Sequence, residues 1–324
     1  MTISSSDLFD PAKPVLVVGG RGFVGSHVVR MLLGAGIPVH LFGPAMKDDL
    51  LADLAGQFGE TEGSVEDRAS LEKTIRDIGA GAVVTMAAYA SGNQGLMRGG
   101  DADSDKAMAI NVEGLRQTFE AARLVGIARV VWADSTVVYG DADRYDKARV
   151  DESDARRPTT FYGLTKVLGE DIAQYYRDRY GMDIVGLRMS LLLGPGLWYQ
   201  GAASAIAGVI RNAKPQVTHP VTFHGDCIDL MHVADVARAT LLALQSPRPL
   251  AAVYNINGFT ASMKDIIAKV EAKVPGYRVA HETAPSLMTF PLISDERFRK
   301  DVGYAPSYGL DEIVDELIGT GVTA

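Results

Sequence analysis

Only one cysteine occurs in the 324 residues of the chain, Cys227. A single thiol excludes an internal disulfide and any metal site built from several cysteines, and it is typical of a reducing compartment. The remaining candidate ligands lack the spacing of a metal site. These are His219, His224, His232 and His281. We therefore expect a cytoplasmic protein without a metal centre.

The sequence also lacks long apolar runs and basic runs. No uninterrupted apolar stretch approaches the ~18 residues that cross a membrane, and residues 1–14 lack the basic and apolar parts of a signal peptide. The 32 Lys and Arg against 40 Asp and Glu leave a net charge of −8. We therefore expect neither a membrane nor a nucleic acid among the partners.

What the sequence does contain is a regular alternation of short apolar runs with segments of helical periodicity. Strands are expected at residues 15–20, 39–42, 62–65, 82–86, 129–133 and 184–189. Helices are expected at residues 24–33, 67–78, 107–125 and 160–180. Repeated β-α units of this length predict an α/β fold of the Rossmann type, a doubly wound parallel sheet covered by helices on both faces.

This rhythm breaks after Met189. A loop rich in Gly, Pro and aromatic residues follows, with a helix expected at residues 202–211, and the rhythm returns in a helix at 233–244 and a strand at 253–256. We predict a cofactor-binding core and a smaller, discontinuous, C-terminal substrate-binding part. The core comprises residues 1–189 plus about 229–258, and the substrate-binding part about 190–228 plus 259–324.

A glycine-rich loop joins the first expected strand to the first helix. Gly19, Gly22 and Gly25 have the spacing G-x-x-G-x-x-G. Glycines allow a tight turn, a close approach of a pyrophosphate to the backbone and close packing of helix against strand. The free N–H groups at the helix N-terminus favour a phosphate. This position between strand and helix predicts a dinucleotide site, with a merely glycine-rich turn as the alternative.

The acidic residue that usually binds the ribose of NAD is missing at the end of the second strand. That place is occupied by Phe42-Gly43-Pro44. Arg21, inside the glycine loop, would neutralise a 2′-phosphate, unless it is simply a solvated loop residue. The sequence therefore predicts NAD(P)(H) as cofactor and favours NADP.

Tyr162 and Lys166 lie four residues apart on an expected helix, and therefore on one face of it. A lysine cation favours the phenolate and lowers the pKa of a tyrosine, which allows proton exchange with an alcohol or carbonyl oxygen. Ser135 follows an apolar strand, at the edge where open α/β sheets bind ligands, and its hydroxyl would donate to the same oxygen. A Tyr-x-x-x-Lys pair taken alone is common by chance.

Together these motifs resemble the extended short-chain dehydrogenase/reductase family, also called the NAD-dependent epimerase/dehydratase family. The similarity runs from the glycine loop through the Ser-x-x-x-Tyr-Gly stretch at 135–140 and the Tyr162–Lys166 pair to residues 229–233. It implies a catalytic triad of Ser135, Tyr162 and Lys166, and places Ser64 where the family usually has an aspartate for adenine. By the same resemblance the cofactor would contact Gly19, Arg21, Gly22, Phe23, Val24, Gly25, Ser64, Val65, Ala87, Ala88, Tyr89, Asn111, Tyr162, Lys166 and Ser190.

Two departures from the family pattern narrow the expected function. Thr136 and Val137 stand where sugar-nucleotide dehydratases of this family carry Asp-Glu, which argues against elimination chemistry. Ile228 stands where nucleotide-sugar epimerases have a diphosphate-binding arginine, and isoleucine cannot form charge-assisted hydrogen bonds. Arg211 and Lys214 are alternatives for that role, although both also fit an exposed helix end. We therefore expect a substrate without a nucleotide.

Candidate substrate contacts follow the fourth and sixth strands. Polar and aromatic contacts are expected from Ser91, Asn93, Trp198 and His224. Apolar walls are expected from Met189, Trp198, Tyr199 and Phe223, and a carboxylate would be bound by Arg98, Arg157 or Arg211. The glycines of residues 91–105 predict a mobile lid.

The working hypothesis is an NAD(P)-dependent oxidoreductase that transfers a hydride to or from a secondary alcohol or ketone carbon of a small non-nucleotide substrate. One alternative is a nucleotide-sugar 4-epimerase with an atypical diphosphate site. Another is a non-catalytic dinucleotide sensor, for which retention of the Tyr162–Lys166 pair is unfavourable. Helices 111–125 and 161–180 are expected to pair in a homodimer, as the family often does.

Overall fold

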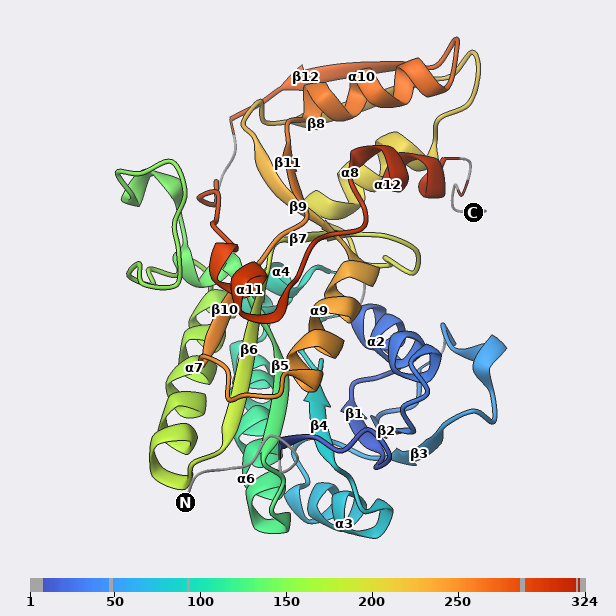
Figure 1. Ribbon diagram of the computed structural model, residues 1–324. Helices are drawn as coiled ribbons and strands as arrows, with labels where there is room; N and C mark the ends of the chain where they lie inside the picture. The colour runs from blue at the N-terminus through green and yellow to red at the C-terminus, as the bar shows by residue number, and fades with distance from the viewer. Residues whose placement is uncertain (1–7, 47–48, 92–93, 286–288, 319, 321–324) are drawn as a thin grey trace.

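The computed structural model describes residues 8–46, 49–91, 94–285, 289–318 and 320. Its centre is a seven-stranded sheet with the order β10-β6-β5-β4-β1-β2-β3, in which every neighbouring pair is parallel (Figure 1). The strands are β1 (Val15–Val18), β2 (Val39–Gly43), β3 (Gly59–Glu62), β4 (Ala82–Thr85), β5 (Arg129–Ser135), β6 (Asp183–Met189) and β10 (Val253–Ile256). This is the predicted doubly wound Rossmann-type fold.

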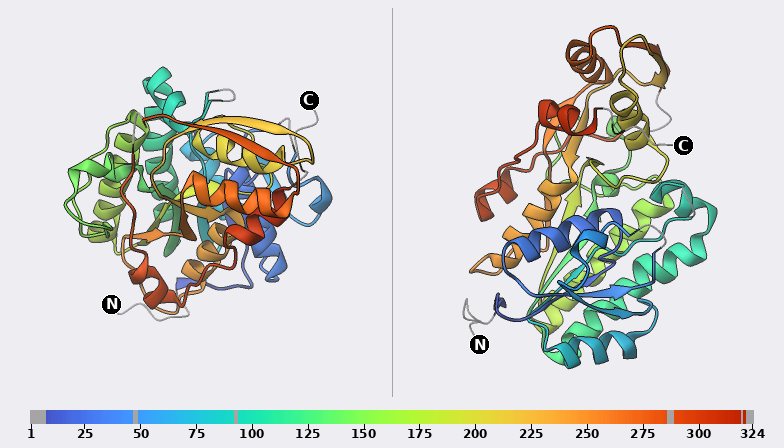
Figure 2. Two further views of the ribbon diagram at one scale, coloured as in Figure 1. Left: turned by 90° about the horizontal axis from the view of Figure 1, so that it is seen from above. Right: turned by 90° about the vertical axis from the view of Figure 1, so that its right-hand side faces the viewer.

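Helices cover both faces of this sheet (Figures 1 and 2). Side chains alternate along β1, so that Val15 and Val17 join one apolar core while Leu16 and Val18 join the other. The first core is covered by α2 (Phe23–Gly34) and α9 (Val233–Gln245). The second is covered by α3 (Arg68–Ile78), α6 (Leu115–Val125) and α7 (Phe161–Tyr180).

The ends of α7 are fixed by local signals. The Thr160 hydroxyl accepts a hydrogen bond from the backbone N–H of Gly163 at 3.0 Å, which caps the helix N-terminus. Gly181 ends the helix with a φ of 69°, a left-handed conformation that glycine adopts without strain. Tyr162 therefore lies in the first turn of α7, and Lys166 lies one turn further along.

Three segments differ from their predicted structure. β3 is formed by 59–62 instead of 62–65, because this edge strand is exposed and has no apolar residue to mark it. The predicted helix 107–125 contains a π-helical turn, η2 (Met108–Gly114), between α5 (Ser104–Ala107) and α6. Much of the predicted lid 91–105 is helical, since it contains α4 (Leu96–Ala102) and the first two residues of α5.

A second part of the chain lies beyond the carboxyl ends of the central strands (Figure 1). One sheet contains β7 (Leu191–Leu193), β9 (Ile228–His232) and β11 (Phe259–Ala261), and another pairs β8 (Thr218–Phe223) with β12 (Arg278–Thr283). They are accompanied by α8 (Ala202–Arg211), α10 (Met263–Lys273) and α12 (Leu310–Leu317). The chain returns to the central sheet in between, through α9 and β10, so the second part is discontinuous. The limits of the two parts stay a prediction.

The remaining elements are short. α11 (Glu296–Val302) packs on β10. Single 3₁₀ turns are η1 (Ala52–Leu54), η3 (Thr136–Tyr139) and η4 (Ala142–Arg144). Among the described residues, no helix has both the length and the apolar character needed to span a membrane.

Candidate active site

A cavity of about 1660 Å³ runs along the carboxyl ends of the parallel strands. Its lining begins at Gly19 after β1, continues past Ser135 at the end of β5, and reaches Phe223 in the second part of the chain. A site for one small molecule typically occupies about 300–1,000 Å³. The cavity therefore has room for a dinucleotide and a second ligand.

The glycine loop forms one end of this cavity, where all six of its predicted cofactor residues, from Gly19 to Gly25, are part of the lining. Gly19 has a φ of 77°, and a Cβ atom there would lie 2.9 Å from the backbone nitrogen of Ala87. A Cβ atom on Gly25 would lie 2.1 Å from the carbonyl oxygen of Gly19. Only glycine fits these positions, and α2 starts at Phe23 with no side chain capping its N-terminus. These features fit a dinucleotide pyrophosphate.

Arg21 is already neutralised within the structure. Its guanidinium donates to Asp49 at 2.7 Å and to Glu60 at 2.6 Å, and both carboxylates line the cavity. These partners raise the pKa of Arg21. Two acidic residues thus lie near the end of β2, although none occurs at 42–44. Because Arg21 is paired with them, it is not a free cation for a 2′-phosphate, and the preference for NADP is no longer supported.

The other predicted cofactor positions divide into two groups. Ser64, Val65, Ala87, Ala88 and Ser190 line the cavity. Tyr89 and Asn111 are not part of its lining, but they are hydrogen-bonded to each other. The Asn111 side-chain oxygen accepts a hydrogen bond from the Tyr89 backbone N–H at 2.7 Å, and its amide donates to Thr165 at 3.3 Å. Asn111 therefore fixes the chain that follows β4 against α7.

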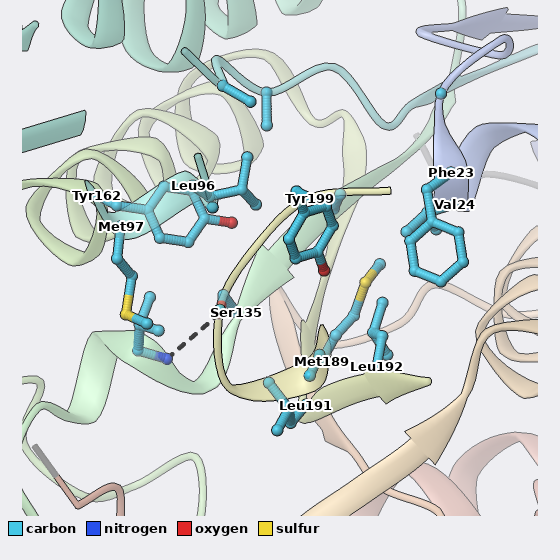
Figure 3. Close-up of a pocket in the computed structure, with 18 of the residues that line it drawn as sticks. Phe23, Val24, Leu96, Met97, Ser135, Tyr162, Met189, Leu191, Leu192 and Tyr199 are labelled. Carbon is cyan, nitrogen blue, oxygen red and sulfur yellow. Dashed lines mark hydrogen bonds between the residues drawn. The ribbon is translucent and has the colours of Figure 1, made fainter. Parts of the chain in front are cut away.

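Ser135 and Tyr162 both reach the middle of the cavity, the serine from the end of β5 and the tyrosine from α7 (Figure 3). The Ser135 hydroxyl accepts a hydrogen bond from the backbone N–H of Val137 at 3.4 Å. Burial raises the pKa of Tyr162, and the neighbouring Asp134 acts in the same direction, whereas contact with the Ser135 hydroxyl opposes it. The hydroxyl groups of Ser135 and Tyr162 thus line the same part of the cavity.

Lys166 lies next to the tyrosine ring and also lines the cavity. Its ammonium nitrogen is 5.4 Å from the centre of the Tyr162 ring and donates a hydrogen bond to the carbonyl oxygen of Ala133 at 2.6 Å. Burial lowers the pKa of Lys166 to about 8, while the nearby Asp134 opposes this shift. All three residues of the predicted triad therefore line the same cavity.

Sequence reasoning missed the buried charges that surround Lys166. Together with Lys166 we call them the charged cluster: Asp134, Lys166, Glu170 and Arg188. Arg188 binds both carboxylate oxygens of Glu170, at 2.7 and 2.8 Å, and lies 3.8 Å from Asp134. Neither carboxyl oxygen of Asp134 accepts a hydrogen bond from a described residue. Burial and the adjacent Glu170 carboxylate raise the pKa of Asp134. The sequence signal for this cluster was a charged residue within each of two apolar strands, Asp134 in β5 and Arg188 in β6.

The predicted substrate residues have different positions. Trp198 and His224 line the cavity, and the His224 ring stacks on Phe223 with 4.5 Å between ring centres. Ser91 lies behind the lining, against Gly99. Asn93 lies outside the described residues. Sequence reasoning also missed Leu96 and Met97, which line the cavity from α4 within the predicted lid.

Most of the arginines proposed for a substrate carboxylate have structural partners. Arg211 donates to the carbonyl oxygens of Gly194 and Leu197, at 3.1 and 3.3 Å. Arg157 donates to the carbonyl oxygen of Arg144 at 2.6 Å. Of the three, Arg98 lines the cavity, as an exposed residue of α4.

His232, one of the histidines considered as a metal ligand, has a structural contact instead. His232 is buried, and its Nε2 lies 2.7 Å from Glu316. Burial lowers the pKa of His232 to about 4, so this ring is neutral at ordinary pH. Within the part of the chain that the structure describes, no group of three His, Cys, Asp or Glu side chains is arranged to hold a metal ion.

The family follows from comparison with known proteins. A model of the NAD dependent epimerase/dehydratase family matches residues 15–257. The chain therefore belongs to this family, the extended short-chain dehydrogenases/reductases, as the sequence motifs predicted.

Individual relatives include both dehydrogenases and epimerases. The chain is 30% identical to D-erythronate dehydrogenase of Cupriavidus necator, over 82% of this chain and 78% of that protein. It is 24% identical to UDP-glucose 4-epimerase of Lacticaseibacillus casei, over 93% and 94%. Its fold is similar to that of a GalE-like L-threonine dehydrogenase from C. necator in its holo form, with a TM-score of 0.80, 23% identity and coverage of 94% and 99%.

Proposed function

We propose that this protein is an NAD-dependent oxidoreductase that interconverts a secondary alcohol and a ketone in a small substrate without a nucleotide. The proposal combines membership of an NAD-dependent family with the grouping of Ser135, Tyr162 and Lys166 at the centre of the cavity. The named dehydrogenase relatives act on small molecules, which supports the same class of reaction.

In the direction of oxidation, the alcohol oxygen binds between the hydroxyls of Ser135 and Tyr162. A bound nicotinamide supplies the acceptor for the hydride that leaves the substrate carbon. Tyr162 takes the proton from the alcohol oxygen, and Ser135 donates a hydrogen bond to that oxygen. The Lys166 cation, 5.4 Å from the tyrosine ring centre, favours the phenolate needed for this step.

The observation that carries the non-nucleotide assignment is the environment of Ile228. Its apolar side chain lines the cavity. By the resemblance to the family, nucleotide-sugar epimerases have an arginine at this position. The adjacent Asp229 faces Arg149 at 3.4 Å and accepts a hydrogen bond from the backbone N–H of Ile293 at 2.7 Å. Arg149, the nearby cation, is thus paired with a carboxylate. It therefore does not replace the arginine that would bind a substrate diphosphate.

The NAD assignment rests on the pairing of Arg21 with Asp49 and Glu60. The two carboxylates neutralise the arginine and repel a 2′-phosphate, while their oxygens are suitable acceptors for ribose hydroxyls. Titration with NADH and NADPH tests this preference, and we expect tighter binding of NADH. NADPH binding as tight as that of NADH would contradict it.

Tyr162→Phe tests the proposed chemistry. Removing the hydroxyl should reduce kcat/KM for secondary alcohols and ketones by about 10²- to 10⁴-fold, the usual contribution of general acid–base catalysis, while NADH binding persists. Tyr308→Phe is the matched control, because Tyr308 lies outside the cavity lining and outside α6 and α7. Retention of most of the activity in Tyr162→Phe would contradict the proposal. Saturable binding of a uridine diphosphate with no net change in cofactor redox state would favour the epimerase alternative.

We also propose a homodimer formed through α6 and α7. These helices expose large apolar side chains to solvent, among them Leu124, Leu164 and Tyr175. Burying such residues against a second copy removes apolar surface from water. Light scattering should therefore give twice the mass of one chain, and a monomeric mass would contradict this assembly.

A further inference from the structure

The side of Tyr162 that faces the second part of the chain is bordered by apolar side chains (Figure 3). We call this space the apolar chamber and define it by Leu96, Met97, Met189, Leu191, Leu192 and Tyr199, all of which line the cavity. In Figure 3 the hydroxyl groups of Tyr162 and Tyr199 point into the space between these residues. The reacting oxygen would therefore meet hydroxyl groups, while the rest of the substrate would meet hydrocarbon and sulfur.

One wall of the chamber is held in place by glycines on α4. A Cβ atom on Gly99 would lie 2.9 Å from the backbone nitrogen of Ser91, and one on Gly100 would lie 3.3 Å from the backbone nitrogen of Tyr162. These close approaches bring α4 directly onto α7 and onto the chain that follows β4. Leu96 and Met97, in the first turn of α4, are thereby placed beside the Tyr162 ring (Figure 3).

The opposite wall is held by Tyr199. Its ring lies edge-on to Phe23 at 6.3 Å between ring centres, and the bridge between Gln94 and Gln200 joins its loop to the start of α4. Burial raises the pKa of Tyr199 to about 12, so its hydroxyl stays uncharged at ordinary pH. The two walls are thus attached to each other.

The charges at the margin of the chamber do not favour a substrate anion. Lys147 lies 2.5 Å from Asp154, and Arg149 faces Asp229. Asp101 and Asp226 add negative charge to the cavity lining. Arg98 also lines the cavity, but its side chain is exposed, so a carboxylate bound among the chamber side chains would lose its hydration with little compensation, which is costly.

We propose that the substrate carries its alcohol or ketone on an uncharged, apolar alkyl or aryl body that fills the apolar chamber. This inference rests on the proposed oxidoreductase function and adds the substrate class. The relatives named for erythronate and threonine act on polar, ionised compounds, so the wall residues predict a different specificity for this chain.

The test uses the full-length protein with NADH and two kinds of ketone. The first is the series 2-butanone, 2-hexanone and 2-octanone, and the second is 7-oxooctanoate, which has the reacting group and length of 2-octanone with a carboxylate at the far end. We expect kcat/KM to rise along the series by up to about fourfold for each added methylene group. The oxo-acid should be at least about tenfold poorer than 2-octanone, because its carboxylate loses hydration among apolar side chains.

Binding of the same compounds to the NADH-loaded protein separates this inference from the proposed function. Preferential binding of 2-octanone without turnover of any ketone would support the apolar chamber and contradict the oxidoreductase proposal. Equal or tighter binding of 7-oxooctanoate would overturn the chamber. An oxo-acid preference that disappears in Arg98→Gln would identify Arg98 as the carboxylate-binding residue and would overturn it as well.

Met97→Gln tests the wall directly, because glutamine has nearly the length of methionine but adds an amide. We expect kcat/KM for 2-octanone to fall about tenfold and the affinity for NADH to stay the same. Met108→Gln is the matched control, since Met108 is exposed and lies outside the cavity lining. An unchanged preference for 2-octanone over 7-oxooctanoate in Met97→Gln would contradict a role for this wall.

Discussion

The two sides of Tyr162 differ completely in polarity. Behind the ring, the charged cluster places Asp134, Lys166, Glu170 and Arg188 in a buried region. In front of it, the residues that define the apolar chamber, such as Met97, carry no charge. The difference teaches that the charged cluster can adjust the proton affinity of Tyr162, while the apolar chamber selects the substrate that reaches its hydroxyl.

The two regions also depend on different forces. Buried charges require partners, and Arg188 supplies hydrogen bonds to Glu170 and to the hydroxyl of Tyr139. The chamber walls need close packing instead, which the glycines of α4 provide. Changes in the charged cluster should therefore alter stability and pH dependence, whereas changes in the chamber should alter substrate preference.

The largest effect is expected from Arg188→Met. Removing this guanidinium leaves Asp134 and Glu170 buried with much less compensation, and we expect the free energy of unfolding to fall by about 3–5 kcal/mol. Denaturant unfolding measures the change. Arg76→Met is the control, because Arg76 forms an exposed pair with Glu72, and pairs of that kind contribute little. Equal stability of both variants would show that the charged cluster is not the stabilising feature described here.

An intermediate effect is expected from Gly99→Ala, which disturbs the packing of the wall of the apolar chamber. The added methyl group would push α4 away from Ser91, and we expect kcat/KM for 2-octanone to fall by about tenfold, within the usual range for overpacking. The affinity for NADH should be unchanged. Gly34→Ala is the control, since its Cβ atom meets no described atom within 4 Å. A uniform loss with all ketones, long and short, would argue against a change confined to the chamber.

The smallest effect is expected from Asp134→Asn, which tests the charged side without removing volume. Ionised Asp134 raises the pKa of Lys166, whose value is held at about 8 by burial. Its removal should lower that pKa further, so activity that requires the lysine cation should be lost at lower pH, by about one unit. The pH profile of kcat/KM measures this shift, with Asp171→Asn on the exposed part of α7 as control. A shift to higher pH would contradict the assigned direction.

The predictable parts of the site are those encoded within a short stretch of sequence. The glycine loop and the Tyr162–Lys166 pair were recognisable because their geometry depends on neighbouring residues in one turn or one helix. The helix and strand of residues 202–211 and 253–256 were located for the same reason, since their periodicity is local.

Features that depend on contacts between distant segments were not predictable. The neutralisation of Arg21 depends on Asp49 and Glu60, which follow it by 28 and 39 residues. The chamber wall at Met97 depends on glycines that let α4 approach α7. In each case the residue types were visible in the sequence, but the distance between them was decided by the tertiary fold.

The π-helical turn η2 determines how Asn111 is oriented beside the cavity. It adds one residue to the turn that carries Asn111, which bonds to the chain after β4 through Tyr89 and to α7 through Thr165. Such turns occur frequently at functional sites. A deletion of one residue here would restore a regular α-helix and rotate Asn111 by about 100°. The orientation of this amide is thus set by the register of the helix as well as by its two hydrogen bonds.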